Sequence, residues 1–177
     1  MSDPIAETRL WIERIVIGLN LCPFARRVFE GGKIRFIESD AEDTDALVAD
    51  LEAELRRLVA EPIKSVETTI LIHPHVLQDF LDYNDFLSRA DQLLETLDLD
   101  GVIQIASFHP QYRFAGTKAD AIENYTNRSP YPMLHLLREE SVSRVAGDAV
   151  FLESIPANNI ETLRKLGLRE LKRLRAE

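Results

Sequence analysis

Three histidines follow two predicted strands directly, and histidine is the side chain best suited to proton transfer near neutral pH. His73 and His75 close the strand that ends at Ile72, and His109 follows Phe108 at the end of another strand. In a parallel sheet, ligands bind outside the carboxyl ends of the strands, at an edge that we call the rim. We therefore predict that these three histidines are catalytic, with His109 the first candidate for general acid or base.

The segment 107–132, which we call the aromatic loop, shows little periodicity but holds five of the chain's 13 aromatic residues. This composition predicts an ordered loop folded over a ligand, because disordered segments are poor in aromatics. Basic side chains lie in or just beyond the loop, and guanidinium groups suit carboxylates and phosphates. The predicted anion-binding residues are Arg113, Lys118, Arg128 and Arg138, with Asn124, Tyr125, Asn127 and His135 as polar contacts. The alternative is that the arginines pair with Asp120, Glu123 and neighbouring acidic helices.

The single cysteine, Cys22, is a further catalytic candidate. It precedes Pro23, which can open a helix, so the thiol would lie at a helix start beside Arg26 and Arg27 and would favour the thiolate. Cys-Pro-Phe-Ala also resembles the active-site turn of glutaredoxin-like and omega-class glutathione transferase-like proteins, over four residues and without the strand that precedes it there. The alternative is a buried structural cysteine.

The histidines do not by themselves predict a metal site. His73-x-His75 on a strand would project both rings to one face, and His109, His135 or Cys22 could complete a ligand set. However, Pro74 interrupts the strand, and neither HExxH nor paired CxxC occurs. We predict no metal and leave the cofactor unknown.

Charge is unevenly distributed along the chain. The formal net charge is −9, but 17 of the 30 acidic residues and only four of the 21 basic residues lie between residues 38 and 100. This balance argues against a nucleic-acid partner and permits an adaptor whose acidic surface meets a basic protein. Without an apolar leader or spanning segment, and with one cysteine, the sequence predicts a cytoplasmic protein with no membrane partner.

Hydrophobic periodicity predicts the elements that must position these residues. Helices are expected over 4–19, 42–60, 77–97, 130–145 and from Asn158, where Glu161 completes a capping box. Strands are expected over 33–38, 66–72, 102–107 and 149–153.

Alternation of strands with long helices predicts the fold class. We expect a single α/β domain over residues 1–177, with a mostly parallel three- to four-stranded sheet and helices on both faces. The alternative is an α+β sandwich with an antiparallel edge strand.

Three motifs carry a family resemblance. LNLCPFA near the start, FHPQYRFAG in the middle and NYTNRSPYPMLHLLRE further on resemble a family of short bacterial proteins defined as a conserved domain of unknown function. The resemblance covers nearly the whole chain. It implies a bacterial single-domain protein, and it implies no activity.

Together these observations predict an enzyme or binding protein for a small anionic molecule, phosphorylated or carboxylated, at the rim. A thiol-dependent redox or conjugation protein using Cys22 and a non-catalytic adaptor are the alternatives. The sequence does not decide whether the protein is an enzyme, and it leaves the oligomeric state open.

Overall fold

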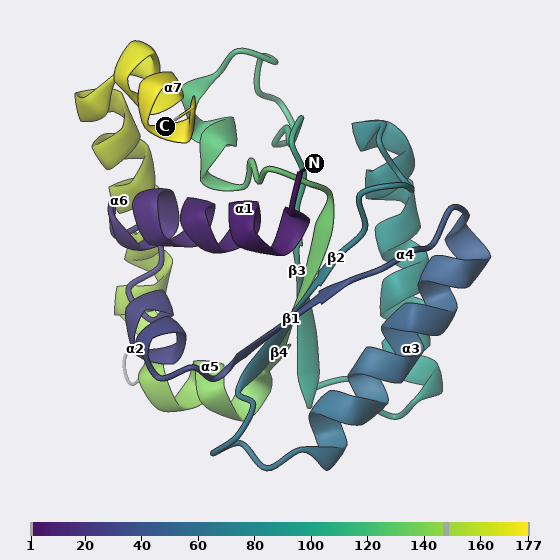
Figure 1. Ribbon diagram of the computed structural model, residues 1–177. Helices are drawn as coiled ribbons and strands as arrows, with labels where there is room; N and C mark the ends of the chain where they lie inside the picture. The colour runs from purple at the N-terminus through teal and green to yellow at the C-terminus, as the bar shows by residue number, and fades with distance from the viewer. Residues whose placement is uncertain (1, 147–148, 177) are drawn as a thin grey trace.

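One mixed β-sheet lies between two layers of helices in the computed structural model, which describes residues 2–146 and 149–176 (Figure 1). Within these residues the sheet has four strands in the order β1-β2-β4-β3. The strands are β1 (Ile34–Glu38), β2 (Thr68–Ile72), β3 (Ile103–Phe108) and β4 (Met133–Arg138).

Helices cover both faces of this sheet. In Figure 1, α3 and α4 lie on one side, and α1, α2, α6 and α7 lie on the other. No helix in the described part of the chain is both long and apolar enough to span a bilayer. The helices are α1 (Pro4–Trp11), the π-helix η1 (Ile12–Ile17), α2 (Ala25–Glu30), α3 (Thr44–Ala60), α4 (Phe80–Thr96), the 3-10 helix η2 (Ile122–Thr126), α5 (Glu139–Ala146), α6 (Ala149–Leu166) and α7 (Leu168–Ala176).

The strand directions correct the expected mostly parallel sheet. β1 and β2 are parallel, whereas β4 is antiparallel to both β2 and β3. β1, β2 and β3 therefore run the same way, and β4 separates β2 from β3. The class is mixed α/β with helices on both faces, and the antiparallel strand lies inside the sheet rather than at its edge.

β4 occupies part of the segment that was expected to be a helix over 130–145. Its sequence, Met133-Leu-His-Leu-Leu-Arg138, is a short apolar run whose composition fits either a buried strand or a helix. Pairing on both sides decides the outcome, because an interior strand buries alternate residues in two different cores. The helix begins only at Glu139, as α5.

The expected strand over 149–153 is also wrong, since these residues form the start of α6. The expected capping box from Asn158 to Glu161 is wrong for the same reason. Asn158 lies in the middle of α6, and its amide lies within 3.5 Å of the Ser154 hydroxyl one turn earlier.

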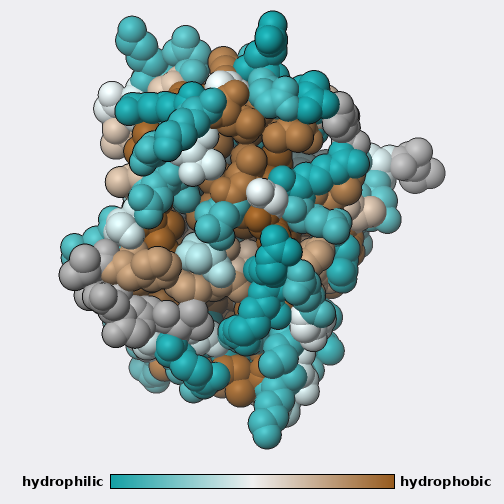
Figure 2. Space-filling view, turned by 90° about the vertical axis from the view of Figure 1, so that its left-hand side faces the viewer, coloured by the Kyte–Doolittle hydropathy of each residue, from teal (hydrophilic) through white to brown (hydrophobic). Residues whose placement is uncertain are grey.

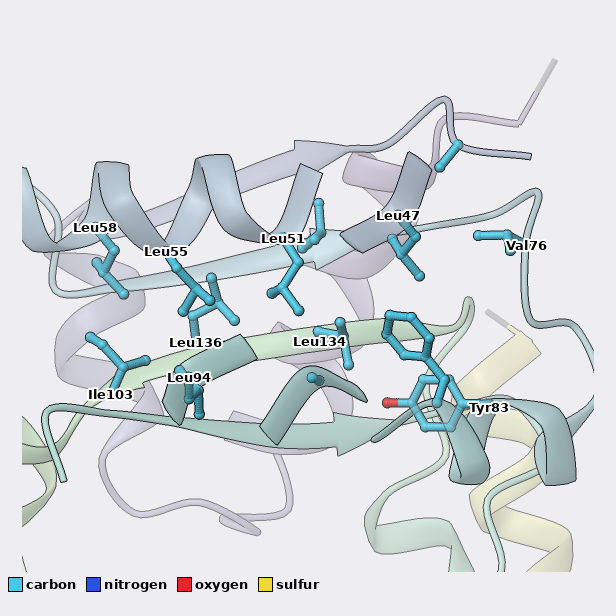
Figure 3. Close-up of a cluster of buried hydrophobic side chains, with 14 residues drawn as sticks. Leu47, Leu51, Leu55, Leu58, Val76, Tyr83, Leu94, Ile103, Leu134 and Leu136 are labelled. Atoms are coloured by element: carbon cyan, nitrogen blue, oxygen red, sulfur yellow. The ribbon is translucent and has the colours of Figure 1, made fainter. Parts of the chain in front are cut away.

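The core between the sheet and α3 and α4 follows the predicted leucine repeat of α3. Leu47, Leu51, Leu55 and Leu58 are at most 1% exposed. In Figure 3 they point from α3 toward β4, where Leu134 and Leu136 are fully buried. Burial of each such side chain contributes about 1.5–3 kcal/mol, so this layer is a main source of stability.

The opposite face carries the second core, which includes Trp11, Ile15, Ile70 and Met133. The predicted helix over 4–19 begins at Pro4, where the Asp3 carboxylate accepts a hydrogen bond of 3.0 Å from the Ala6 amide. It ends at Ile17, and its second half widens into η1. Such π-helical turns are rare and concentrate at functional sites.

We expect Tyr83→Phe to lower the free energy of unfolding by about 1–3 kcal/mol, because it removes both hydrogen bonds of a fully buried hydroxyl. The Tyr83 hydroxyl donates to the Met133 carbonyl (2.7 Å) and accepts from the Phe108 amide (3.0 Å), so one side chain of α4 joins β4 to β3. Urea unfolding measures this change. Tyr131→Phe is the matched control, since that hydroxyl bonds Glu7 at the surface (2.8 Å) and its loss should cost less than about 0.5 kcal/mol. Equal effects of the two substitutions would contradict the prediction.

Candidate functional site

His73 and His109 come together at the rim, because β2 and β3 run in the same direction. Both rings contact Tyr83, with centroid separations of 5.8 Å for His73 and 5.0 Å for His109. Phe80 adds a further ring at 5.5 Å from His109. The strand ends therefore meet in a buried aromatic cluster.

Backbone groups bond to three of the four ring nitrogens of these histidines, and His73 Nε2 is buried without a hydrogen-bond partner. His73 is fully buried and donates from Nδ1 to the Val76 carbonyl (3.0 Å), and its burial lowers the pKa to about 4. His109 is also fully buried; its Nε2 donates to the Leu77 carbonyl (3.1 Å), and its Nδ1 accepts from the Gln111 amide (3.0 Å). Burial lowers the pKa of His109 as well. Both are neutral rings that brace the turns after β2 and β3.

His75 does not join this cluster. Its side chain is exposed at the surface, one residue beyond Pro74. The three predicted catalytic histidines therefore do not converge on one cleft.

The aromatic loop is ordered by its own polar side chains. Asn124 is fully buried; its Oδ1 accepts from the Phe114 amide (3.0 Å) and the Thr117 hydroxyl (2.9 Å), and its Nδ2 donates to the Lys118 carbonyl (2.8 Å). Asn127 donates to the Ser107 carbonyl (3.0 Å). These amides hold the loop in shape, so their polar atoms are already used.

Two of the predicted anion-binding arginines share one groove at the rim. A cavity of about 420 Å³ lies between the start of α4 and the aromatic loop, and it is lined by Arg113, Arg128, Asp79 and apolar neighbours. Arg113 donates through Nε to the Thr117 carbonyl (2.8 Å). Arg128 donates to the carbonyls of Tyr112 (3.1 Å) and Ala119 (2.6 Å).

The remaining predicted contacts lie elsewhere. Lys118 is exposed, and Tyr125 lies beneath the guanidinium of Arg128, 4.5 Å from its ring centroid. Arg138 is buried at the last position of β4, at the end of the sheet opposite the rim. Its Nη2 lies within 3.0 Å of the carbonyls of Leu58, Glu61 and Val66, where it joins the end of α3 to the start of β2.

A second cavity, of about 330 Å³, lies on the sheet face opposite α3 and α4, and we call it the sheet-face cavity. β2, β3 and β4 contribute alternate residues to its floor and β1 contributes Ile34, and residues of α1, η1, α2 and α5 form its walls. The floor includes three registered rows: Thr68–Leu137–Gln104, Ile70–His135–Ala106 and the Met133–Phe108 pair. Ala106, the smallest side chain of the middle row, leaves the space above it open.

Hydrophobic side chains dominate the lining. Trp11 and Phe108 pack edge to face at 5.6 Å, and Ile12, Val16 and Val28 add further apolar walls. Figure 2 shows the side of the molecule that carries α2, α5 and α6, where hydrophobic residues gather in the middle of the surface between hydrophilic side chains. The interior of this cavity therefore favours apolar groups.

Few polar groups enter this lining. The His135 Nε2 lies 2.6 Å from the Thr68 hydroxyl, and enclosure of the ring lowers the pKa of His135 to about 4. Glu67 and Arg27 form a bidentate ion pair with distances of 2.5 and 3.1 Å. Burial raises the pKa of Glu67, but the hydrogen bonds and charge of Arg27, with smaller contributions from Ser141 and Lys33, together outweigh burial and lower the pKa.

Cys22 also lines the sheet-face cavity, and it is half-buried. Burial raises the pKa of its thiol, although the amides of Phe24 and Ala25 act in the opposite direction. The expected thiolate-favouring arginines are engaged elsewhere, since Arg26 pairs with Glu30 and Arg27 with Glu67. The thiol is thus more basic than an ordinary cysteine, and its role in chemistry stays a prediction.

No group of three or more histidine, cysteine or acidic side chains that could hold a metal occurs in the described residues. The acidic helices α3 and α4 lie side by side on one face of the sheet (Figure 1), and they pair partly with each other through Arg89 and Asp45 (2.8 Å). The adaptor hypothesis stays a prediction.

Sequence reasoning missed Thr68, Gln104 and Ala106 and misplaced His135 on a helix. The alternation of β2 and β3 was available as a signal, since it places Thr68 and Ile70, or Gln104 and Ala106, on one face. Because β4 was expected to be a helix, the residues of β2 and those of β3 could not be recognised as parts of one cavity floor.

Comparisons with known proteins give one match. A family model described as a protein of unknown function (DUF1415) matches residues 3–173, nearly the whole chain. This confirms the expected family of unknown function, whereas bacterial origin stays a prediction. The comparisons with curated proteins and with solved structures find no match.

We expect the burial of His73 to make stability pH-dependent. Above about pH 6.5 its ring is neutral in both states, and as the pH falls from 6.5 toward 4 the unfolded chain takes up the proton first. The free energy of unfolding should fall across this window, by up to about 3 kcal/mol from this residue. Urea titrations between pH 7.5 and 4 measure it.

His73→Asn should remove this residue's share of the dependence, since an amide can donate to Val76 without titrating, whereas His109 and His135, whose pKa values burial also lowers, keep theirs. His75→Gln should leave the profile as in the wild type, because His75 is exposed. A His73→Asn profile that matches the wild type would show that this histidine does not titrate as the burial implies.

Proposed function

The chain belongs to the DUF1415 family of proteins of unknown function, and we propose that it binds one small, mainly apolar molecule in the sheet-face cavity. The observation that carries this proposal is the shape and lining of that cavity. It is about 330 Å³ in volume, apolar over most of its walls, and furnished with a few polar side chains. These are the usual properties of small-molecule sites.

The charge inside the cavity favours a neutral ligand. Arg27 is the cationic residue among those that line it, and Glu67 engages its guanidinium through both carboxylate oxygens. An anion would therefore compete with a carboxylate for the same donors. The His135 ring carries no positive charge near pH 7, so it adds no attraction for an anion.

The proposal concerns binding and leaves catalysis open. The structure describes no hydrogen bond between Cys22 and His135, so the two do not form a preassembled nucleophile and base. A half-buried free thiol suits a reducing compartment, which keeps a cytoplasmic location within the proposal.

Ala106→Leu should block this cavity from its floor. We expect the variant to fold and to bind naphthalene at least about tenfold more weakly than the wild type, because the added side chain occupies the ligand's volume. Calorimetric titration with naphthalene, supported by amide chemical shifts of β3 and β4, measures the loss.

Ala49→Leu, which makes the same change on the exposed side of α3, is the matched control and should bind as the wild type does. Thermal unfolding of both variants checks that they are folded. Undiminished naphthalene binding by a folded Ala106→Leu variant, or no binding by the wild type, would refute the proposal.

A second candidate function is anion binding in the rim groove. The observation that favours it is that Arg113 and Arg128, predicted from the sequence to bind phosphate or carboxylate, line one cavity. Their guanidinium groups give only part of their donors to loop carbonyls. The Asp79 carboxylate in the same groove, which accepts from the Leu81 and Asp82 amides, opposes an anion.

Arg113→Ala tests this candidate, because Arg113 is exposed and the substitution spares the bracing contacts of Arg128. Phosphate titration followed by the amide signals of 110–114 should show at least about threefold weaker binding for the variant. Arg56→Ala, which removes an exposed arginine paired with Glu52, serves as the control. Equal phosphate affinity of Arg113→Ala and wild type would eliminate the rim groove.

A further inference from the structure

The hydrogen bonds of Thr68 fix the protonation of the His135 ring. The Thr68 hydroxyl lies 2.6 Å from the Leu136 carbonyl and 2.6 Å from His135 Nε2. A carbonyl can only accept, so the single hydroxyl proton goes to Leu136. The Thr68 oxygen must then accept, which requires a proton on Nε2.

With Nε2 protonated in a neutral ring, Nδ1 carries a lone pair. The structure describes no hydrogen bond to this nitrogen, although the ring is half-buried among apolar side chains. His135 lies in the middle of the cavity floor, between Ile70 and Ala106 in register. Nδ1 is not among the buried polar atoms that lack a partner in the described residues, so a small molecule can reach it, and a donor on that molecule would bond to it.

The other polar groups of the lining make no hydrogen bond to His135 in the described structure, and one of them, Trp11 Nε1, is itself a buried donor without a partner. Arg27 is committed to Glu67, and no hydrogen bond from Cys22 to His135 is present in the described structure. Glu67 is an acceptor, and its lowered pKa keeps it ionised. Nδ1 of His135 is therefore available to a molecule in the cavity that His135 lines.

We infer that the ligand of the sheet-face cavity is a compact aromatic or aliphatic molecule whose hydroxyl or N–H group donates a hydrogen bond to Nδ1 of His135. This inference rests on the proposed function and narrows its ligand class to neutral donors, of the phenol or indole type. Ionised carboxylates and phosphates are excluded as donors, because their oxygens only accept hydrogen bonds and would face the lone pair of Nδ1. Thr68 acts as a positioning residue that selects the ring tautomer.

Three probes of one ring system test the inference. 2-Naphthol carries the donor, 2-fluoronaphthalene has nearly the same shape without it, and 2-naphthoate carries a negative charge. The ratio of the dissociation constants of 2-fluoronaphthalene and 2-naphthol should be about 3- to 10-fold larger for the wild type than for His135→Phe, which keeps a flat ring and lacks both nitrogens. His75→Phe, at an exposed position, should keep the wild-type ratio.

The outcomes separate this inference from the proposed function. Equal ratios in wild type and His135→Phe would overturn the donor inference, and so would tighter binding of 2-naphthoate than of 2-naphthol. In either case, loss of naphthalene binding in Ala106→Leu would still support a ligand cavity. Failure of all probes to bind the wild type would overturn both.

A second measurement does not depend on folding of His135→Phe. Nitrogen-15 spectra of the wild-type ring should show a protonated Nε2 and an unprotonated Nδ1. Thr68→Val removes the group that accepts from Nε2, so both tautomers should appear and the preference for 2-naphthol should fall. A wild-type ring with Nδ1 protonated would overturn the inference.

Discussion

The insertion of β4 between β2 and β3 is the constraint on which the rest of the structure depends. As an interior strand, it must satisfy backbone partners on both sides and bury both of its faces. Leu134 and Leu136 enter the core beneath α3 and α4, while Met133, His135 and Leu137 form the middle of the opposite face. One strand thus supplies a packed core to one layer and the floor of a cavity to the other.

The two layers differ because of side-chain volume along the register. Beneath α3 and α4, the leucines of these helices pack against Leu134 and Leu136 of β4 and fill the space between the helices and the sheet. On the other face, Ala106 lies opposite His135, and η1 replaces regular α-helix above the same region. A small residue below and a widened helical turn above leave a space that close packing would otherwise remove. The cavity is therefore a product of particular side chains and not of the topology alone.

Much of the fold was predictable, because the helix and strand periods are strong where one face is buried and the other is wet. α3, α4, β1, β2 and β3 agree with their predicted ranges to within a few residues. β2 is buried at every position and was predicted from its β-branched residues, whereas the leucine-rich sequence of β4 fits a helix equally well. The sequence correctly placed His73 and His109 at the same ends of two strands that run in the same direction. It did not show whether their ring nitrogens are free to act in catalysis. Whether a histidine is free or bound to a carbonyl depends on turns such as 76–77, whose conformation appears only in three dimensions.

The last helix, α7, packs in the same core as the first helices, α1 and η1. Arg175 donates to the Arg128 carbonyl (2.6 Å) and lies over Tyr125, while Leu171 packs in the same core as Trp11 and Ile15. During synthesis, the layer of α3 and α4 has β1, β2, β3 and β4 available once residue 138 has left the ribosome. The other layer is complete only when α7 is also available, because Leu171 belongs to the core around Trp11 and Ile15. The core that joins Trp11 to Leu171 is therefore built from contacts between residues far apart in the sequence, and such contacts form slowly because closing a long loop costs chain entropy.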